Sequence, residues 1–247
     1  MAGRLAGRHI LISGGGSGIG HATAMRCAEE GAVVTVVGRR LDCLKEVARL
    51  TRGHAIAADL TDEAQAFAAV NDAAALMGCL DGIINCVGNA EAAVLEDIDL
   101  ARWDASLRTN LTSHYLVCRA ALPHLRKTRA AAIVNVSALA GIRPGVSSAA
   151  YGAAKAGVIQ FTKTLAAQLA PDIRVNCVCP GAVDTEMMDR FLAGKSASQQ
   201  DAFLARYALR RLAIPLEIAN LLLFLVSSEA QYITGSNYVC DGGRAYQ

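Results

Sequence analysis

The sequence predicts a doubly wound α/β fold with a parallel sheet, built as a single domain over residues 1–247. Short β-branched runs alternate with longer segments of helical period, and a glycine-rich turn stands between the first run and the first helical segment. Hydrophobic residues make up 53% of the chain and charged residues 19%. This composition supplies enough apolar side chains to cover both faces of a parallel sheet.

The first strand, the first helix and the second strand form a β-α-β unit at residues 9–13, 18–30 and 33–37. The alternation continues with strands at 54–58, 82–86 and 131–137, and with helices from Asp62, over 103–125 and over 150–169. Late strands follow at 173–179 and 237–240. Because strands joined by helix-length crossovers run parallel and the crossovers are right-handed, we expect helices on both faces of the sheet.

The segment 182–207 interrupts this alternation directly after Pro180-Gly181. It is polar and contains methionines, and such a segment next to a strand end commonly covers a bound substrate. We therefore expect residues 182–207 to form a substrate lid within the single domain.

Charge and hydropathy argue against several classes of partner. The formal net charge is +2 and the basic residues are dispersed, so we expect no nucleic-acid partner. The chain start lacks an apolar core with a cleavage site, and the most apolar run, 221–226, is too short to span a bilayer. We expect a cytoplasmic protein with no membrane association.

The eight cysteines include no C-x-x-C pair, and most lie in apolar segments. This pattern is typical of reduced cysteines in a protein core. The five histidines lack the spacing of metal ligands, so we expect no metal site.

A glycine-rich turn occupies positions 13–20 and reads Ser-Gly-Gly-Gly-Ser-Gly-Ile-Gly. Glycines at such a turn allow the backbone to approach a pyrophosphate, which then lies on the free N–H groups and positive dipole of the following helix. The spacing is G-x-x-x-G-x-G.

This spacing resembles that of the short-chain dehydrogenase/reductase family, and the resemblance extends over nearly the whole chain. The further matching segments are Asp59 after the third strand, Asn85-Cys86-Val87-Gly88 in place of N-N-A-G, Asn110 at the start of N-L-T, Tyr151-Gly-Ala-Ala-Lys155, Pro180-Gly181 with Thr185, and Asp241-Gly-Gly243. The resemblance implies a Rossmann fold and a 3-oxoacyl reductase-like enzyme.

The resemblance also implies a nicotinamide dinucleotide bound at the carboxyl ends of the strands. The residues expected to hold it are Gly14, Ser17, Gly18, Ile19, Gly20, Arg39, Arg40, Asp59, Leu60, Asn85, Gly88, Tyr151, Lys155, Pro180, Gly181, Val183 and Thr185.

The end of the second strand discriminates between the two nicotinamide cofactors. Arg39 and Arg40 stand where a carboxylate would accept hydrogen bonds from a ribose 2′-hydroxyl, and an arginine there pairs with a 2′-phosphate. This favours NADP(H) over NAD(H). The alternative interpretation is a solvated pair that caps the next helix.

Tyr151 and Lys155 are spaced i and i+4, which places them on one face of a helix. A lysine in that position is expected to make the phenol more acidic and so prepare it for proton transfer. Tyr115 and Tyr207 each have an arginine at i+4, but arginine does not release a proton, so we interpret them as packing or surface pairs.

In the family, the lysine also holds the nicotinamide ribose, an asparagine positions water and a serine polarises the substrate oxygen. Lys155 and Asn110 match the first two roles, but Ala138 occupies the serine position and the hydroxyl lies one residue earlier, at Ser137. Three interpretations follow. A local irregularity brings Ser137 into place, or Ser147 or Ser148 substitutes from the loop, or the hydroxyl is absent.

Together these features predict an NAD(P)(H)-dependent oxidoreductase that interconverts a secondary alcohol and a ketone, with Tyr151 as general acid/base. The expected partner is a small carbonyl or alcohol, with a 3-oxoacyl thioester among the candidates. The alternative is a cofactor-binding protein with little turnover that acts through its partners. A third hypothesis, a dehalogenase that binds no nucleotide, is disfavoured by Lys155.

The resemblance further implies a homotetramer built through the helices of Asn110 and Tyr151, whereas the apolar run 221–226 is equally compatible with a core position.

Overall fold

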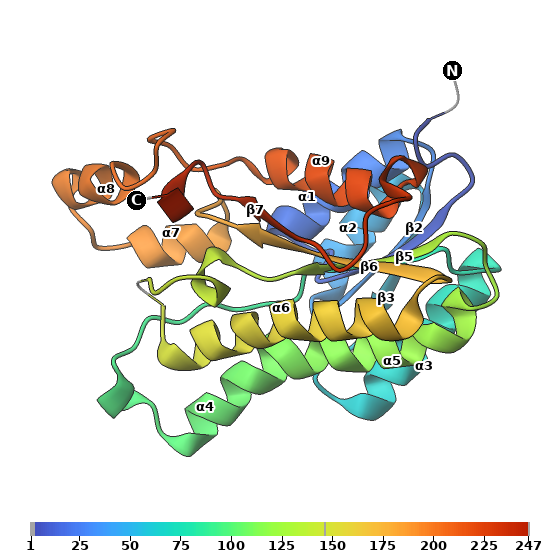
Figure 1. Cartoon of the computed structure of the whole chain (residues 1–247), viewed down its shortest axis with the longest axis horizontal. Helices are drawn as coiled ribbons and strands as arrows, with labels where there is room; N and C mark the ends of the chain where they lie inside the picture. The colour runs from blue at the N-terminus through green and yellow to red at the C-terminus, as the bar shows by residue number, and fades with distance from the viewer. Residues whose placement is uncertain (1–2, 146, 247) are drawn as a thin grey trace.

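One seven-stranded parallel sheet forms the centre of the molecule in the computed structural model, which describes residues 3–145 and 147–246 (Figure 1). The strand order is β3-β2-β1-β4-β5-β6-β7. The strands are β1 (His9–Ser13), β2 (Val33–Gly38), β3 (His54–Ala57), β4 (Gly82–Asn85), β5 (Ala131–Val136), β6 (Ile173–Pro180) and β7 (Asn237–Cys240). The order reverses between β1 and β4, and at such a point a ligand crevice opens beyond the carboxyl ends of the strands.

Helices cover both faces of the sheet, as Figure 1 shows. One apolar layer joins the sheet to α1 (Gly18–Glu29), α2 (Leu41–Thr51) and α9 (Pro215–Val226). The other joins it to α3 (Glu63–Met77), α5 (Ser113–Leu125) and α6 (Ala149–Leu169). The predicted single-domain, doubly wound parallel α/β fold is therefore confirmed.

The helix expected over 103–125 is divided into three segments in the structure. It consists of α4 (Leu100–Leu107), a π-helical turn (Arg108–Thr112) and α5. A π-turn inserts one residue into the helical repeat and is common at functional sites. Periodicity alone could not reveal it, because the polar and apolar pattern continues across the turn.

The apolar run 221–226 is part of α9, where Leu222, Leu223, Leu225 and Val226 are fully buried. The run is therefore core within the chain itself. Other predicted boundaries differ by a residue or so; the strand expected over 54–58, for example, ends at Ala57.

The segment 182–207 folds into two short helices, α7 (Glu186–Leu192) and α8 (Ala197–Leu204). They lie beside the carboxyl ends of the strands, away from the layers that cover the sheet (Figure 1). Across residues 3–145 and 147–246, none of the helices combines the length and the apolar character that a membrane crossing requires.

Candidate active site

A cavity of about 1240 Å³ opens at the carboxyl ends of the strands. Its volume exceeds the ~300–1,000 Å³ that one small ligand usually occupies, so it has room for a dinucleotide and a substrate. Most of the residues predicted from the sequence line it: Gly14, Ser17, Gly18, Ile19, Gly20, Arg39, Arg40, Asp59, Leu60, Gly88, Ser137, Tyr151, Lys155, Pro180, Gly181, Val183 and Thr185. Asn85 and Asn110 lie behind this lining.

The glycine turn is shaped for close approach of the backbone to a ligand. Gly14 has φ of +69°, and a Cβ atom on Gly20 would lie 2.2 Å from the carbonyl oxygen of Gly14. Ser17 is the N-cap of α1, and its side chain makes no capping bond. The N–H groups of the first turn of α1 thus face the cavity without a side-chain acceptor at the cap, which is an arrangement that fits a pyrophosphate.

Arg39 and Arg40 differ in their surroundings. The Arg40 guanidinium forms an ion pair with Glu186 on α7 at 3.1 Å, and both side chains are more than half exposed. Arg40 is the N-cap residue of α2, but its side chain makes no capping bond. Arg39 lines the cavity near Asp59.

Asp59 is held in its charged form. Its Oδ1 accepts hydrogen bonds from the Thr61 backbone N–H at 3.0 Å and from the Thr61 hydroxyl at 2.8 Å. The backbone bond is the main cause of a lowered pKa at Asp59, and the nearby Arg39 lowers this pKa further. A carboxylate and a guanidinium therefore stand together at this end of the cavity.

The side chain of Asn85 is fully buried and does not line the cavity. Its Oδ1 accepts from the Ser13 hydroxyl at 3.0 Å, and its Nδ2 donates to Oδ1 of Asn135 at 2.9 Å. Asn135 in turn donates to the Thr162 hydroxyl at 3.0 Å. This chain of hydrogen bonds links β1, β4, β5 and α6 below the cavity. Asn85 thus supports the strand ends, and reasoning from the sequence missed Asn135 and Thr162.

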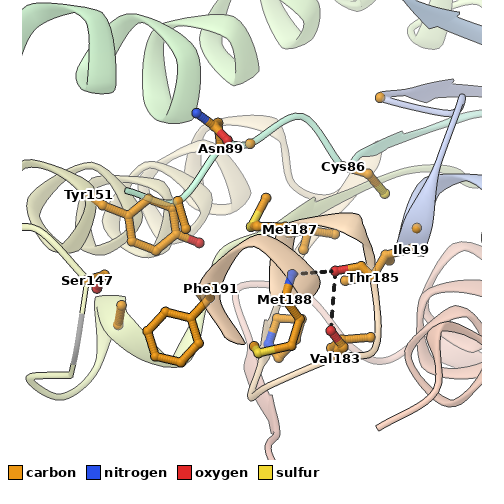
Figure 2. Close-up of a pocket in the computed structure, with 18 of the residues that line it drawn as sticks. Ile19, Cys86, Asn89, Ser147, Tyr151, Val183, Thr185, Met187, Met188 and Phe191 are labelled. Carbon is orange, nitrogen blue, oxygen red and sulfur yellow. Dashed lines mark hydrogen bonds between the residues drawn. The ribbon is translucent and has the colours of Figure 1, made fainter. Parts of the chain in front are cut away.

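Tyr151 and Lys155 lie in the first two turns of α6, whose start is capped by the Ser148 hydroxyl accepting from the Tyr151 backbone N–H at 3.2 Å. Both side chains are buried, 9% and 2% exposed. Lys155 Nζ donates to the carbonyl oxygen of Val136 at 3.0 Å and lies 5.9 Å from the centre of the Tyr151 ring. Figure 2 shows the Tyr151 hydroxyl pointing into the cavity.

The expectation that Lys155 makes Tyr151 more acidic is wrong for this structure. Burial raises the pKa of Tyr151, and the neighbouring Cys179 raises it further. Burial also lowers the pKa of Lys155 to about 8. The ammonium group is directed at the Val136 carbonyl, and desolvation of the phenol outweighs any effect of the lysine.

Asn110 lies in the π-turn and clamps the loop after β4. Its Oδ1 accepts from the Asn89 backbone N–H at 2.9 Å, and its Nδ2 donates to the carbonyl oxygens of Asn89 at 3.1 Å and Ser106 at 3.0 Å. A Cβ atom on Gly88 would lie 3.1 Å from Lys155 Nζ and 3.2 Å from Asn110 Oδ1. Asn110 therefore fixes this loop against Lys155.

The hydroxyl of Ser137 is already used within the protein. It donates to the carbonyl oxygen of Lys155 at 2.6 Å, and the side chain is buried. Ser148 caps α6, whereas Ser147 and Ala138 line the cavity. Figure 2 shows Ser147 on the same side of the cavity as Tyr151.

The opposite side of the cavity is apolar and aromatic. Met187, Met188 and Phe191 enter from α7, as Figure 2 shows. Phe191 packs on Phe203 with ring centres 5.2 Å apart, and Phe203 packs on Tyr207 at 5.5 Å. Reasoning from the sequence missed Phe203 and did not place Tyr207 in the cavity, because only the fold of 182–207 brings them there.

A second group of polar side chains lies at the amino ends of the strands, far from the cavity. His9 Nδ1 lies 3.0 Å from Asp81 Oδ2 and 2.9 Å from Cys79 Sγ. These three ligand-type atoms all lie within 4.8 Å of one another. Sequence spacing did not indicate this group, because His9 is about seventy positions from its partners and only the pairing of β1 with β4 joins them.

The chain is similar to known oxidoreductases over nearly its whole length. The family model described as "Enoyl-(Acyl carrier protein) reductase" matches residues 14–245. The 2-(S)-hydroxypropyl-CoM dehydrogenase 3 of Xanthobacter autotrophicus is 36% identical, with 98% of each chain covered. The 3-oxoacyl-[acyl-carrier-protein] reductase FabG of Thermotoga maritima is 36% identical, over 97% of this chain and 98% of the relative.

A solved structure extends the similarity to the whole fold. A Burkholderia xenovorans protein described as a short-chain dehydrogenase/reductase superposes with a TM-score of 0.94 and 36% identity. The superposition covers 100% of this chain and 99% of the other. The two chains therefore share the same fold over their whole length.

Proposed function

The chain belongs to the short-chain dehydrogenase/reductase family and is an NAD(P)(H)-dependent oxidoreductase; from this premise we propose that Tyr151 is its general acid/base in the interconversion of a secondary alcohol and a ketone. The observation that carries the proposal is the buried pair Tyr151 and Lys155, on one face of α6 and beside the glycine turn in a single cavity. The bound nicotinamide cofactor supplies or accepts the hydride.

The residues of the chain move and position the proton. The Tyr151 phenol is protonated at neutral pH, and burial, by raising its pKa, holds it more firmly in this form, which suits donation to a carbonyl oxygen. Lys155 would hold the cofactor ribose next to Tyr151, and Asn110 holds the loop that brings Gly88 close to Lys155.

NADP(H) is the proposed cofactor in preference to NAD(H). The Arg39 guanidinium lines the cavity near the end of β2 and is available to a 2′-phosphate, whereas Arg40 pairs with Glu186. The remaining contacts proposed for the cofactor are the residues of the glycine turn, Asp59 with Leu60, the backbone of the Asn85–Gly88 loop, and the segment from Pro180 to Thr185 that includes Gly181 and Val183.

Ser137 and Ser147 are the proposed candidates for polarising the substrate oxygen. Ser137 must give up its bond to the Lys155 carbonyl to donate, whereas Ser147 already lines the cavity. Removing the serine that polarises the substrate oxygen is expected to lower turnover by ~10²–10³ without removing cofactor binding. Poor turnover with full cofactor binding is the behaviour of the alternative function, in which the protein acts through partners.

The proposed substrate is a small ketone or secondary alcohol, with 3-oxoacyl thioesters among the candidates. The two relatives are named for a 2-hydroxypropyl and a 3-oxoacyl substrate. Residues 182–207 form the proposed lid, since α7 and α8 provide the apolar wall that faces Tyr151.

A cytoplasmic homotetramer is the proposed form of the protein. Exposed Tyr115 on α5 and Val239 on β7 provide apolar surface on the elements that the assembly would use. Light scattering coupled to gel filtration measures the mass directly, and about four times 25.8 kDa is expected.

Turnover of wild type and Tyr151→Phe with NADPH and NADH tests the proposed function. Wild type is expected to reduce ketones or 3-oxoacyl thioesters, and Tyr151→Phe is expected to bind NADPH while losing ~10²-fold or more in kcat. Cofactor binding without turnover on any substrate would contradict the reductase proposal and support the partner-dependent alternative. Arg39→Gln is expected to weaken NADPH binding more than NADH binding.

A further inference from the structure

Five cations gather at the end of the cavity formed by α7, α8, the loop after β5 and the C-terminal turn. They are Arg143, Arg190, Lys195, Arg206 and Arg244, and we call them the cationic rim. Arg190, Lys195 and Arg206 belong to the segment 182–207, and the tertiary structure brings Arg143 and Arg244 to the same cavity. The whole chain has a net charge of just +2, so this is a strong local concentration.

The acidic residues of the cavity do not neutralise the rim. Glu91 pairs with Arg102, and Glu186 pairs with Arg40. The third acid of the lining, Asp59, accepts from Thr61 beside Arg39. Among residues 3–145 and 147–246, four members of the rim have no carboxylate within ion-pair distance: Arg190, Lys195, Arg206 and Arg244.

Contacts tie the rim to the substrate side of the cavity. Arg206 and Arg244 both lie close enough to the buried Tyr207 phenol to oppose the rise in its pKa that burial causes. Lys195 Nζ lies 4.4 Å from the centre of the Phe191 ring. Arg143 donates to the carbonyl oxygen of Arg244, which joins the loop after β5 to the C-terminal turn.

Asp241 lies near this arrangement, since it also acts on the Tyr207 phenol. Its oxygens accept from the backbone N–H of Gly243 at 2.9 Å and of Ala245 at 2.6 Å. These bonds hold the Asp241 carboxylate within the C-terminal turn, and its single negative charge is outnumbered by the five positive charges of the rim.

We propose that the cationic rim binds an anionic group of the substrate, a carboxylate, sulfonate or phosphate, while the apolar wall of Met187 and Phe191 holds the carbon chain and Tyr151 faces the carbonyl. This inference rests on the proposed reductase function and specifies its substrate class. Guanidinium groups are suited to such anions because they form paired, charge-assisted hydrogen bonds.

Matched ketone pairs test the inference. The probes are 3-oxobutanoate, 4-oxopentanoate and 5-oxohexanoate, each compared with its methyl ester, in turnover with NADPH and NADH. For the acid of best length, kcat/KM is expected to exceed that of its ester by about 10-fold or more. The ratio of acid to ester is expected to fall as salt is raised.

Substitutions in the cationic rim test whether these residues bind the anionic group of the substrate. Arg206→Gln, Arg244→Gln and Arg143→Gln are each expected to lower the acid-to-ester ratio by about 10-fold. Arg126→Gln, an exposed control at the end of α5 outside the cavity, is expected to keep the wild-type ratio. Melting temperature and cofactor binding are measured for each variant, so that a folding defect is recognised. An undiminished ratio in all three rim variants would overturn the inference.

Measuring the binding of the acids and esters without turnover tests the anion site independently of the proposed reductase function. The acids are expected to raise the melting temperature of the NADPH-loaded protein more than their esters do, whether or not they are turned over. Equal effects of acids and esters, with ketone reduction intact, would overturn the anion site and leave the reductase. A preference for acids with no turnover would reject the reductase and retain the anion site.

Discussion

Tyr151 and Lys155 are both buried. Burial raises the pKa of Tyr151 and lowers that of Lys155, so it favours the neutral form of each side chain. For a phenol the neutral form is the proton donor, and for a lysine it is the amine. The Lys155 pKa of about 8 leaves the ammonium group charged at neutral pH but only narrowly. The hydrogen bond to the Val136 carbonyl satisfies one of its protons.

The lowered pKa of Lys155 predicts a pH-dependent stability. Between about pH 8 and 10.5 the unfolded chain keeps the proton that the folded chain has released. Since the unfolded state then binds more protons, the contribution of Lys155 to the free energy of unfolding rises with pH across this window. Chemical denaturation of wild type and Lys155→Met from pH 7 to 10 measures this, and the wild-type value is expected to rise relative to the variant. A constant difference between the two proteins would contradict the assignment.

Ala138 provides a second prediction at the residue scale. Ala138→Ser places a hydroxyl at the family position in the cavity wall. If neither Ser137 nor Ser147 polarises the substrate oxygen, kcat is expected to rise by ~10-fold or more because the substrate oxygen gains a donor. Ser137→Ala and Ser147→Ala, measured in the same assay, identify the donor used by the wild type. No gain from Ala138→Ser would show that an effective donor is already present.

At the scale of the element, the glycine turn and the start of α1 form one unit. The Cβ position of Gly20 lies 2.2 Å from the Gly14 carbonyl oxygen, whereas that of Gly16 lies 3.4 Å from its nearest neighbour, Cβ of Cys43. Two glycines of the same turn thus face different constraints. At position 20 only glycine fits, because a Cβ atom would collide with the backbone, whereas position 16 has room for a methyl group.

Gly20→Ala is therefore expected to destabilise the protein by ~1–3 kcal/mol, because the turn must move away from α1. Cofactor affinity is expected to fall with it, since the same backbone faces the pyrophosphate. Gly16→Ala is the matched control, and its free energy of unfolding is expected to stay within ~0.5 kcal/mol of wild type. Urea denaturation distinguishes the two, and equal losses would refute the close-contact argument.

For the whole molecule, the cavity is built from nearly every strand end and from both lid helices. A ligand that fills it contacts segments separated by most of the chain, from Gly14 to Arg244. Such a ligand binds the folded state alone, so binding must stabilise the entire domain.

NADPH is thus expected to raise the melting temperature of the whole protein in a single transition. At a concentration of ~100 times the dissociation constant the gain is ~2.7 kcal/mol. Differential scanning calorimetry with and without NADPH measures it, and NADH at the same concentration is expected to give a smaller shift. An equal shift from the two cofactors would contradict the preference assigned to Arg39.

The fold class, the glycine turn and the pair Tyr151 and Lys155 could all be predicted from the sequence. These features are local in the chain: hydrophobic period, glycine spacing and an i, i+4 pair each involve few neighbouring residues. Most of the site residues predicted from the sequence line the cavity.

Four features became visible only in the folded chain: the direction of the Tyr151 pKa shift, the burial of Asn85, the use of the Ser137 hydroxyl and the assembly of the cationic rim. Each depends on contacts between distant segments, such as Ser137 with the Lys155 carbonyl or Arg143 with the C-terminal turn. Desolvation and hydrogen bonding depend on what surrounds a group in space, and a linear pattern does not contain that information.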